Sequence, residues 1–251
     1  MSGLNKIYVV GIGPGEYEQM TVKAVRALER AEVIVGYKGY VDLIKDSFPE
    51  KEYCSTAMKG EIERCKSALE YCGNGRITAV VCSGDAGVYG MASLIYELIE
   101  SGGDDIEVEV IGGVTAAMSG AALLGAPLTH DFSVISLSDL LTPLDLIEKR
   151  VECAAMSDMC ICIYNPSSTK RGRYLLRMCE IIMRHQPKTL ICGAAKNIGR
   201  ENEAYEILTL EELAGYEADM FTTVFVGNSH TRIINGKMVT PRGYAEKYGV
   251  N

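Results

Sequence analysis

The regular alternation of short apolar runs with amphipathic stretches constrains this chain most. Apolar runs at 6–13, 32–37, 77–84 and 106–113 are separated by segments with helical periodicity. Continuous apolar strands alternating with helices are typical of a parallel sheet whose two faces are covered. The first half of the chain is therefore predicted to be α/β, with helices at about 60–73 and 88–101.

The pattern changes after residue 128. Strand candidates at 132–138, 159–166 and 189–197 are joined by predicted helices at 143–156 and 172–185. Shorter segments follow, and the last of them contains Asn235-Gly236, a strong β-hairpin signal. We therefore expect antiparallel pairing near the end of the chain and a mixed sheet in its second half.

This change of pattern predicts two α/β domains. The N-terminal domain is expected at 1–112 with a mostly parallel sheet, and the C-terminal domain at 119–251 with a mixed sheet. Residues 113–118 form the expected interdomain turn, and the active-site cleft is expected between the domains.

Charge and terminal sequence narrow the class of protein. The net charge is −8 and there is no basic cluster, which argues against nucleic-acid binding. No apolar run is long enough to span a bilayer, and the N-terminus does not show the pattern of a signal peptide. A cytoplasmic protein is expected, in which an anionic substrate is met by a few local cations.

The nine cysteines show neither a CxxC pair nor the ligand spacing of a zinc site. Cys160 and Cys162 are close in sequence but project from the same side of a strand, which is unfavourable for a disulfide. We expect reduced, buried thiols and no bound metal.

The first glycine-rich turn, "GIGPGE", lies between an apolar strand and a helical pattern. Gly11 and Gly13 fit a dinucleotide fingerprint, but Glu16 occupies the third glycine position, and Pro14 lacks an N–H donor. Three interpretations stay open: a dinucleotide site, a tight structural turn, and a loop that lines a site for a ligand without phosphate. The last is favoured.

Two further turns, "SGDAGVYG" at 83–90 and "GGVTAA" at 112–117, repeat the strand–glycine–helix arrangement. Asp85 leaves the carboxyl end of a strand, where ligands of open α/β sheets bind, although a helix N-cap also explains it. Thr115 is expected at a helix start. Three such turns predict one crevice lined by main chain, suited to a small polar cofactor.

Together, the ordered motifs resemble the tetrapyrrole methylases, which use S-adenosylmethionine. The resemblance covers about residues 7–244, and it is carried by these segments: "VGIGPGEYEQMT", "SGDAGVYG", "GGVTAAMSGAALLGAPL", "YNPSSTKR" and "NIGRENE". Within the family, 130–143 and 222–244 resemble the branch that methylates carbon 17 of precorrin-3B in cobalamin synthesis. The resemblance implies methyl transfer coupled to ring contraction, usually by a homodimer; whether the anionic tetrapyrrole contains cobalt stays open.

The resemblance also implies site residues. The implied cofactor-binding residues are Pro14, Gly84, Asp85, Val88, Gly90, Thr115, Ala116, Tyr164, Asn165, Ala195, Lys196, Thr222, Thr223 and Val224. The expected substrate-binding residues are Gly11, Gly13, Gly15, Tyr37, Lys38, Lys59 and Arg171. For Lys38, Lys59, Arg64, Lys170, Arg171 and Arg173, taken one at a time, a solvated surface position is the stronger alternative.

The chain departs from the family pattern at three places. Ala86 stands where a proline is usual, and "VGYKGY" lacks the aspartate that some relatives use. Lys196 stands in place of an arginine, so a bidentate contact there is in doubt.

Ring contraction requires proton movement, and His130, Asp131, Ser136 and Ser138 are the candidate catalytic residues, with Asp139 beside them. A histidine bonded to backbone at the entry of a strand explains His130 equally well. His185 is expected at the surface, and His230 is a weaker candidate for the cleft.

Three alternatives stay open at this point. A methylase for another carbon, such as the precorrin-4 enzyme, shares the motifs. A NAD-dependent oxidoreductase and a catalytically silent binding protein come from other functional classes.

Overall fold

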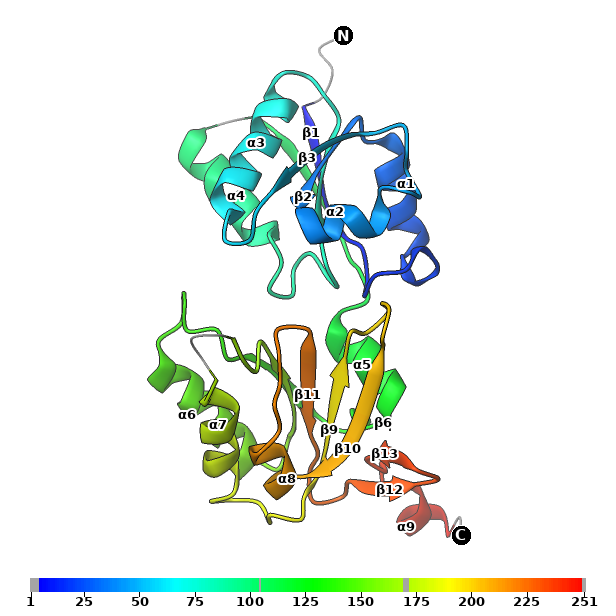
Figure 1. The fold of residues 1–251 in the computed structure, drawn as a ribbon, viewed down its shortest axis with the longest axis vertical. Coiled ribbons are helices and arrows are strands. Elements are labelled where there is room, and N and C mark those ends of the chain that lie inside the picture. The colour runs from blue at the N-terminus through cyan, green and yellow to red at the C-terminus, as the bar shows by residue number, and fades with distance from the viewer. Residues whose placement is uncertain (1–4, 104, 169–171, 250–251) are drawn as a thin grey trace. The chain divides into compact units, whose positions relative to one another are not determined.

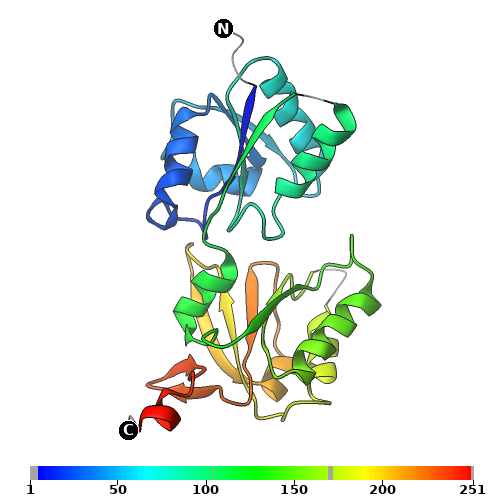
Figure 2. The same cartoon turned by 180° about the vertical axis from the view of Figure 1, so that it is seen from behind.

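The computed structural model describes residues 5–103, 105–168 and 172–249. The chain divides into two compact units, Met1–Ala116 and Ala117–Asn251, which are considered one at a time (Figures 1 and 2). Within the described residues, no helix combines the length and the hydropathy needed to cross a membrane.

The first unit is built on a five-stranded sheet in which every pair of neighbours is parallel. In spatial order its strands are β3 (Glu52–Thr56), β2 (Val33–Tyr37), β4 (Thr78–Cys82), β1 (Lys6–Gly11) and β5 (Glu107–Ile111). The central strands are buried on both faces, as their unbroken apolar sequences require. The predicted parallel sheet is confirmed.

Helices cover both faces of this sheet (Figure 1). On one face lie α1 (Val22–Arg30) and α2 (Lys38–Ile44), and on the other lie α3 (Glu61–Gly73) and α4 (Ala92–Gly102). The chain moves along the sheet in one direction from β1 to β3 and in the other from β3 to β5. Because β–α–β crossovers are right-handed, this reversal places α3 and α4 on the face opposite α1 and α2.

In this unit one boundary differs from the sequence prediction, and two elements were not predicted. Helix α4 begins at Ala92 rather than at 88, so that the whole stretch 83–91 is loop. The helix α2 and the strand β3 were not predicted, because their apolar residues are too few to show a clear period.

The second unit contains a mixed sheet, as predicted. Its strands in spatial order are β10 (Ala204–Thr209), β9 (Ile191–Lys196), β11 (Thr222–Val226), β8 (Cys160–Tyr164) and β7 (Phe132–Ser136). Only β7 and β8 pair in parallel, and the other three pairs are antiparallel.

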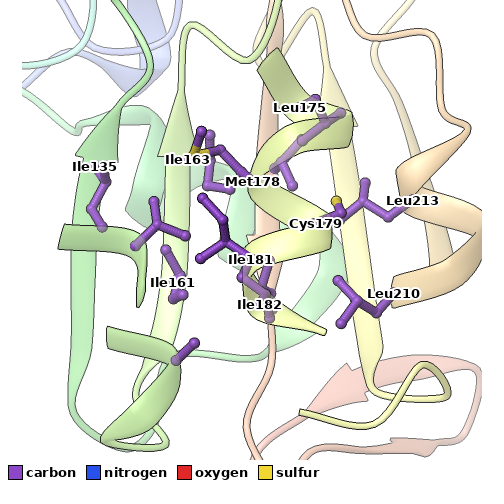
Figure 3. Close-up of a cluster of buried hydrophobic side chains, with 14 of the residues drawn as sticks. Ile135, Ile161, Ile163, Leu175, Met178, Cys179, Ile181, Ile182, Leu210 and Leu213 are labelled. Carbon is purple, nitrogen blue, oxygen red and sulfur yellow. The ribbon is translucent and has the colours of Figure 1, made fainter. Parts of the chain in front are cut away.

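One face of the mixed sheet carries the largest apolar cluster of the unit, formed with α6 (Leu144–Met156), α7 (Tyr174–Ile182) and α8 (Leu210–Ala214) (Figure 3). The other face is covered by α5 (Ala116–Leu124). A Cβ added at Gly120 of α5 would lie 2.8 Å from the Phe225 ring, so a glycine is needed for this close approach.

The predicted hairpin at the end of the chain is confirmed. Strands β12 (Arg232–Ile234) and β13 (Lys237–Val239) are antiparallel, and Asn235 and Gly236 have φ of 49° and 73°. Strand β6 (Gly125–Ala126) pairs with β13, and α9 (Tyr244–Tyr248) follows.

All nine cysteines are free, and seven are buried. Burial raises the pKa of Cys82 to about 11 and that of Cys65 to about 12, so these thiols stay protonated and behave as small apolar side chains. The expectation of burial is wrong for Cys153, which is exposed on α6, and Cys54 is half-buried.

Candidate functional site

Three glycine-rich loops meet at one edge of the parallel sheet. They follow β4, β1 and β5, which are neighbours in the sheet, so the loops all leave from its carboxyl edge. The direction of the chain along the sheet reverses between β4 and β1, and this is the place where open α/β sheets bind ligands.

Backbone hydrogen bonds connect the first two loops directly. The Gly13 N–H donates to the Gly84 carbonyl at 3.0 Å, and the Gly84 N–H donates back to the Gly13 carbonyl at 2.8 Å. The Ile12 N–H donates to the Cys82 carbonyl at 2.9 Å. A dinucleotide cradle would need such N–H groups to be free for phosphate, so the geometry contradicts that interpretation of the first loop.

The glycines of these loops allow the loops to touch one another. A Cβ at Gly113 would lie 2.1 Å from the Gly84 carbonyl oxygen, and one at Gly11 would lie 2.7 Å from the same oxygen. A Cβ at Gly90 would lie 2.3 Å from the Ala86 carbonyl oxygen. The structural-turn interpretation is therefore correct for this part of the loops, and the buried Pro14 and Gly15 continue it.

Asp85 connects the second and third loops. Its Oδ1 accepts hydrogen bonds from the Gly87 and Val88 N–H groups at 2.8 and 3.0 Å, and its Oδ2 accepts one from the Gly113 N–H at 2.9 Å. The N-cap alternative is wrong, because α4 begins at Ala92 after Met91. Three of about four acceptor positions on the carboxylate are thus engaged within the protein.

The outer part of the second and third loops is open to solvent. Val88 is 36% exposed, Tyr89 is 57% exposed, and Val114 is 37% exposed. Sequence reasoning missed Tyr89, which adopts a left-handed φ of 54°, a conformation that non-glycine residues rarely adopt. At Gly112 a Cβ would meet only the Asp85 carboxylate, at 3.3 Å. This exposed main chain with apolar neighbours fits a nucleoside-like ligand such as S-adenosylmethionine.

The predicted substrate-binding side chains of this unit have different surroundings. Lys38 is exposed and forms an ion pair with Asp42 at 2.7 Å. Lys59 is exposed in the loop after β3, with a φ of 68°. Tyr37 packs edge-to-face on Tyr40, with ring centroids 5.1 Å apart. Lys170 and Arg171 lie outside the described residues.

Arg64 contradicts the surface alternative, because it is 3% exposed. Its guanidinium donates to the Thr56 hydroxyl at 2.9 Å, to the Ala57 carbonyl at 3.1 Å and to the Met91 sulfur at 3.3 Å. Within the described residues no carboxylate pairs with it. Arg64 thus fixes the loop after β3 and the end of the second glycine loop to α3.

The predicted cofactor-binding residues of the second unit gather at one edge of the mixed sheet, together with Ser136. Ser136 and Tyr164 end the parallel strands β7 and β8 and are paired in register. Lys196 ends β9 opposite Thr222, which begins the antiparallel strand β11. Since all four positions lie at the same edge, the sheet brings together residues that are up to 86 positions apart in sequence.

Side-chain hydrogen bonds organise this edge. The Asn165 amide donates to the Ser136 Oγ at 2.9 Å, and the Ser138 N–H donates to the same oxygen at 3.2 Å. The Tyr164 hydroxyl accepts a hydrogen bond from the Ala117 N–H at 2.6 Å, at the start of α5. Thr115 directly precedes this helix, as predicted, and Ala116 is its first residue.

Lys196 pairs with Asp219 at 2.7 Å, and the hydrogen bond raises the pKa of the lysine. The Thr222 hydroxyl donates to the same aspartate at 2.9 Å. Sequence reasoning missed Asp219, which no motif marks. Ala195 and Val224 are fully buried. Val224 belongs to the apolar cluster, whereas Ala195 is paired with Thr223 in register and shares the opposite face of the sheet with it.

His130 and Asp131 lie at the opposite end of β7 from Ser136. The strand runs from Phe132 to Ser136, which separates its two ends by roughly 13 Å. The four predicted catalytic residues therefore do not come together in one group.

The His130 Nε2 lies 3.1 Å from the Pro241 carbonyl oxygen, so this histidine is bonded to backbone. Its ring stacks on that of His230, with centroids 5.7 Å apart. An open cavity of about 520 Å³ at this end is lined by His130, Asp131, Phe132, Ser157 and Met159. His185 contacts the Glu152 carboxylate at 3.3 Å and is also remote from Ser136, since it follows α7.

Comparison with known proteins places this geometry in a family. The model of the tetrapyrrole (corrin/porphyrin) methylases matches residues 6–214. A Salmonella typhimurium protein named "Probable cobalt-factor III C(17)-methyltransferase" is 45% identical over 236 residues, which are 94% of this chain and 98% of that protein. A "Cobalt-factor III methyltransferase" of Priestia megaterium is 43% identical over 98% of this chain but only 46% of its own length.

A solved structure supports the same relationship. The crystal structure of the methyltransferase CobJ is 36% identical to this chain, with a TM-score of 0.89 over 96% of this chain and 100% of that chain. The match of the family model over most of the sequence, together with these relatives, shows that the chain belongs to the tetrapyrrole methylase family.

Proposed function

We propose that this protein transfers a methyl group from S-adenosylmethionine to carbon 17 of a cobalt-factor III type tetrapyrrole in cobalamin biosynthesis, with contraction of the ring. One observation carries the proposal: the identity of 45% to the Salmonella protein extends over 94% of this chain and 98% of its relative. The names of the relatives also favour a substrate that contains cobalt, a point that the sequence left open.

The exposed main chain around Asp85 is the proposed holder of the cofactor in the first unit. Gly87, Val88 and Gly112 offer backbone groups and small apolar surface to a nucleoside. When bound, S-adenosylmethionine supplies an activated methyl group on a sulfonium sulfur. Asp85 keeps this surface in shape through its three hydrogen bonds, so we propose that it acts as a positioning residue.

In the second unit, Tyr164 and Asn165 are the proposed cofactor-binding residues. Asn165 has a left-handed φ of 52° and its amide is held by Ser136, so its backbone is fixed before any ligand arrives. Lys196 is neutralised by Asp219, and its proposed role is therefore to shape the edge rather than to bind an anion directly.

Catalysis of this type depends on position more than on covalent chemistry. A sulfonium methyl group is already activated, so the protein must align donor and acceptor and exclude water. Main-chain hydrogen bonds hold the loops of the first unit and side-chain hydrogen bonds hold the edge of the second, which suits this task. Ser136 and Ser138 are the predicted proton-handling residues that lie beside Asn165.

The decisive experiment is anaerobic incubation of the purified protein with S-adenosylmethionine and the trimethylated intermediate, with and without cobalt. We expect the product mass to rise by one methyl group and a ¹³C-labelled methyl to appear at carbon 17 by NMR. A methyl group at another carbon would support the precorrin-4 type of enzyme instead. Absence of transfer to both substrates would contradict the proposal.

Cofactor choice is tested separately by thermal shift. S-adenosylhomocysteine is expected to raise the melting temperature and NAD to leave it unchanged, because the Gly13 and Ile12 amides are engaged within the protein. The reverse result would revive the oxidoreductase alternative. A methylase-like chain that binds neither cofactor would instead be a binding protein.

The resemblance to the family further supports a cytoplasmic homodimer. Light scattering coupled to size-exclusion chromatography measures the mass of the particle. A particle of about 55 kDa, twice the 27.3 kDa of one chain, is the expected result.

A further inference from the structure

Two adjacent leucines project from the segment that joins β7 to α6. Leu140 is 72% exposed and Leu141 is 98% exposed. Leucine is among the residues most often buried, and a pair this exposed at the tip of one connecting segment calls for an explanation.

The segment that carries the leucines is anchored at both ends. Leu137 is buried in the apolar cluster, and its N–H donates to the Tyr164 carbonyl at 2.9 Å. The Asp139 carboxylate accepts a hydrogen bond from the Tyr174 hydroxyl at 2.8 Å, and Pro143 precedes the first turn of α6. The two leucines are therefore held in solvent by a fixed support.

Their position links them to the candidate site. Leu137 bonds to Tyr164, and Ser136 bonds to Asn165, so the segment leaves the same edge of the mixed sheet that carries the proposed cofactor-binding residues. Any substrate that approaches a methyl donor at Tyr164 and Asn165 comes close to the start of this segment.

The exposed apolar area of Leu140 and Leu141 indicates which kind of partner can cover them. A leucine side chain that becomes buried loses roughly 60–120 Å² of apolar surface, so the pair covers about 250 Å² at most. A specific protein–protein interface buries about 800 Å² on each partner, of which roughly 450 Å² is apolar, so the two leucines suit a flat small molecule better than a protein surface.

We propose that Leu140 and Leu141 form an apolar contact for the face of the tetrapyrrole macrocycle. This inference rests on the proposed function. A macrocycle with carboxylates at its rim presents charge around its edge and an apolar face in the middle. The leucines bury part of that face, while the rim stays in water or meets cations.

The test measures binding of the tetrapyrrole by titration of its own absorbance, independently of turnover. The double variant Leu140→Asn, Leu141→Asn is compared with Met156→Asn, because Met156 is 65% exposed at the far end of α6 from the candidate edge. We expect the double variant to weaken tetrapyrrole binding about tenfold to fiftyfold. Its affinity for S-adenosylhomocysteine and its melting temperature should stay unchanged, and Met156→Asn should bind the tetrapyrrole as the wild type does.

Three outcomes overturn the inference. Unchanged tetrapyrrole affinity in the double variant shows that the leucines do not contact the ring. A change of particle mass in the double variant shows that they contact a second copy of the chain instead. A wild type that does not bind the tetrapyrrole removes the inference together with the proposed function, whereas a wild type that binds without methylating removes the function alone.

Discussion

Asp85→Ala tests whether the carboxylate holds the glycine loops together. The change removes the acceptor for three backbone N–H groups, those of Gly87, Val88 and Gly113. Hydrogen bonds to a charged group contribute about 1.5–3 kcal/mol each when their loss leaves a buried donor unpaired. Gly87 and Val88 are exposed, so water replaces the carboxylate there at little cost. The partly buried link to Gly113 dominates, and the total loss is expected to be about 2–4 kcal/mol.

Asp85→Asn separates the contribution of the turn at Gly87 and Val88 from that of the link to Gly113. An asparagine keeps one oxygen for the Gly87 and Val88 N–H groups, but its NH₂ group faces the Gly113 N–H as donor against donor. We expect a loss of about 1.5–3 kcal/mol, most of the effect of the alanine variant. A smaller loss, below about 1 kcal/mol, would show that the turn at 85–88 matters more than the link to Gly113.

Urea denaturation followed by circular dichroism measures the free energy of unfolding of both variants. For a chain of this length, each kcal/mol lowers the melting temperature by about 2–4 °C, so Asp85→Ala should melt roughly 4–16 °C below the wild type. Asp46→Ala, at an exposed position after α2, is the matched control and should change the unfolding free energy by less than about 0.5 kcal/mol. If Asp85→Ala behaved like this control, the carboxylate would not be holding the loops together.

Three further predictions concern other parts of the chain. Gly113→Ala places a Cβ 2.1 Å from a carbonyl oxygen and should lower the unfolding free energy by more than about 2 kcal/mol. The control Gly73→Ala has open space around it and should leave the unfolding free energy unchanged or slightly higher. Equal effects of the two changes would contradict the packing argument. Lys23 and Lys6 lower the pKa of Glu109 to about 2, so the stabilisation from this carboxylate is complete above its unfolded pKa of about 4.3 and is lost as the pH falls toward 2. The denaturation midpoints at pH 7 and pH 2.5 should therefore differ less in Glu109→Gln than in the wild type. An equal difference in both proteins would show that the two ion pairs are not populated in solution. A disulfide exchange reagent should modify one thiol fastest, and Cys153→Ser should remove that fast phase. If the phase persisted, the half-buried Cys54 or one of the buried cysteines would have to be the fast-reacting thiol.

The periodicity of the sequence predicted the class of the fold well. Strands such as Thr78–Cys82 are short, apolar and bounded by glycine, so their local pattern already indicates burial on both faces. The hairpin at Asn235-Gly236 was equally predictable, because such a turn requires residues that tolerate a left-handed φ, and Asn and Gly do so. Residues 38–44 were missed because a seven-residue helix covers too few turns to show a period.

The contacts within the candidate site were predicted less completely than the fold. Motifs identify which loops reach the sheet edge, but they do not show which atoms each loop uses on its neighbours. Asp85 therefore looked like a helix cap or a ligand contact, although its oxygens hold Gly87, Val88 and Gly113. Lys196 was expected to contact the cofactor, and its pairing with Asp219 could not be predicted, because Asp219 lies 23 positions away in a stretch without a motif.

The same limit applies to His130 and Ser136, which are six positions apart. Nearness in sequence suggested one proton-handling group, but an extended strand between them places them at opposite ends of the sheet. Strand geometry decides this separation, and it becomes visible only once the strand is located.

The reciprocal hydrogen bonds between Gly13 and Gly84 also bear on the energetics of ligand binding. A glycine-rich loop is usually taken to be mobile, and a mobile loop loses conformational entropy each time it closes on a ligand. Here the two loops are fastened to each other by main chain, so that this entropy is lost once, during folding. A ligand that arrives at this edge meets a surface that is already ordered, and its binding energy remains available for alignment of the reacting groups.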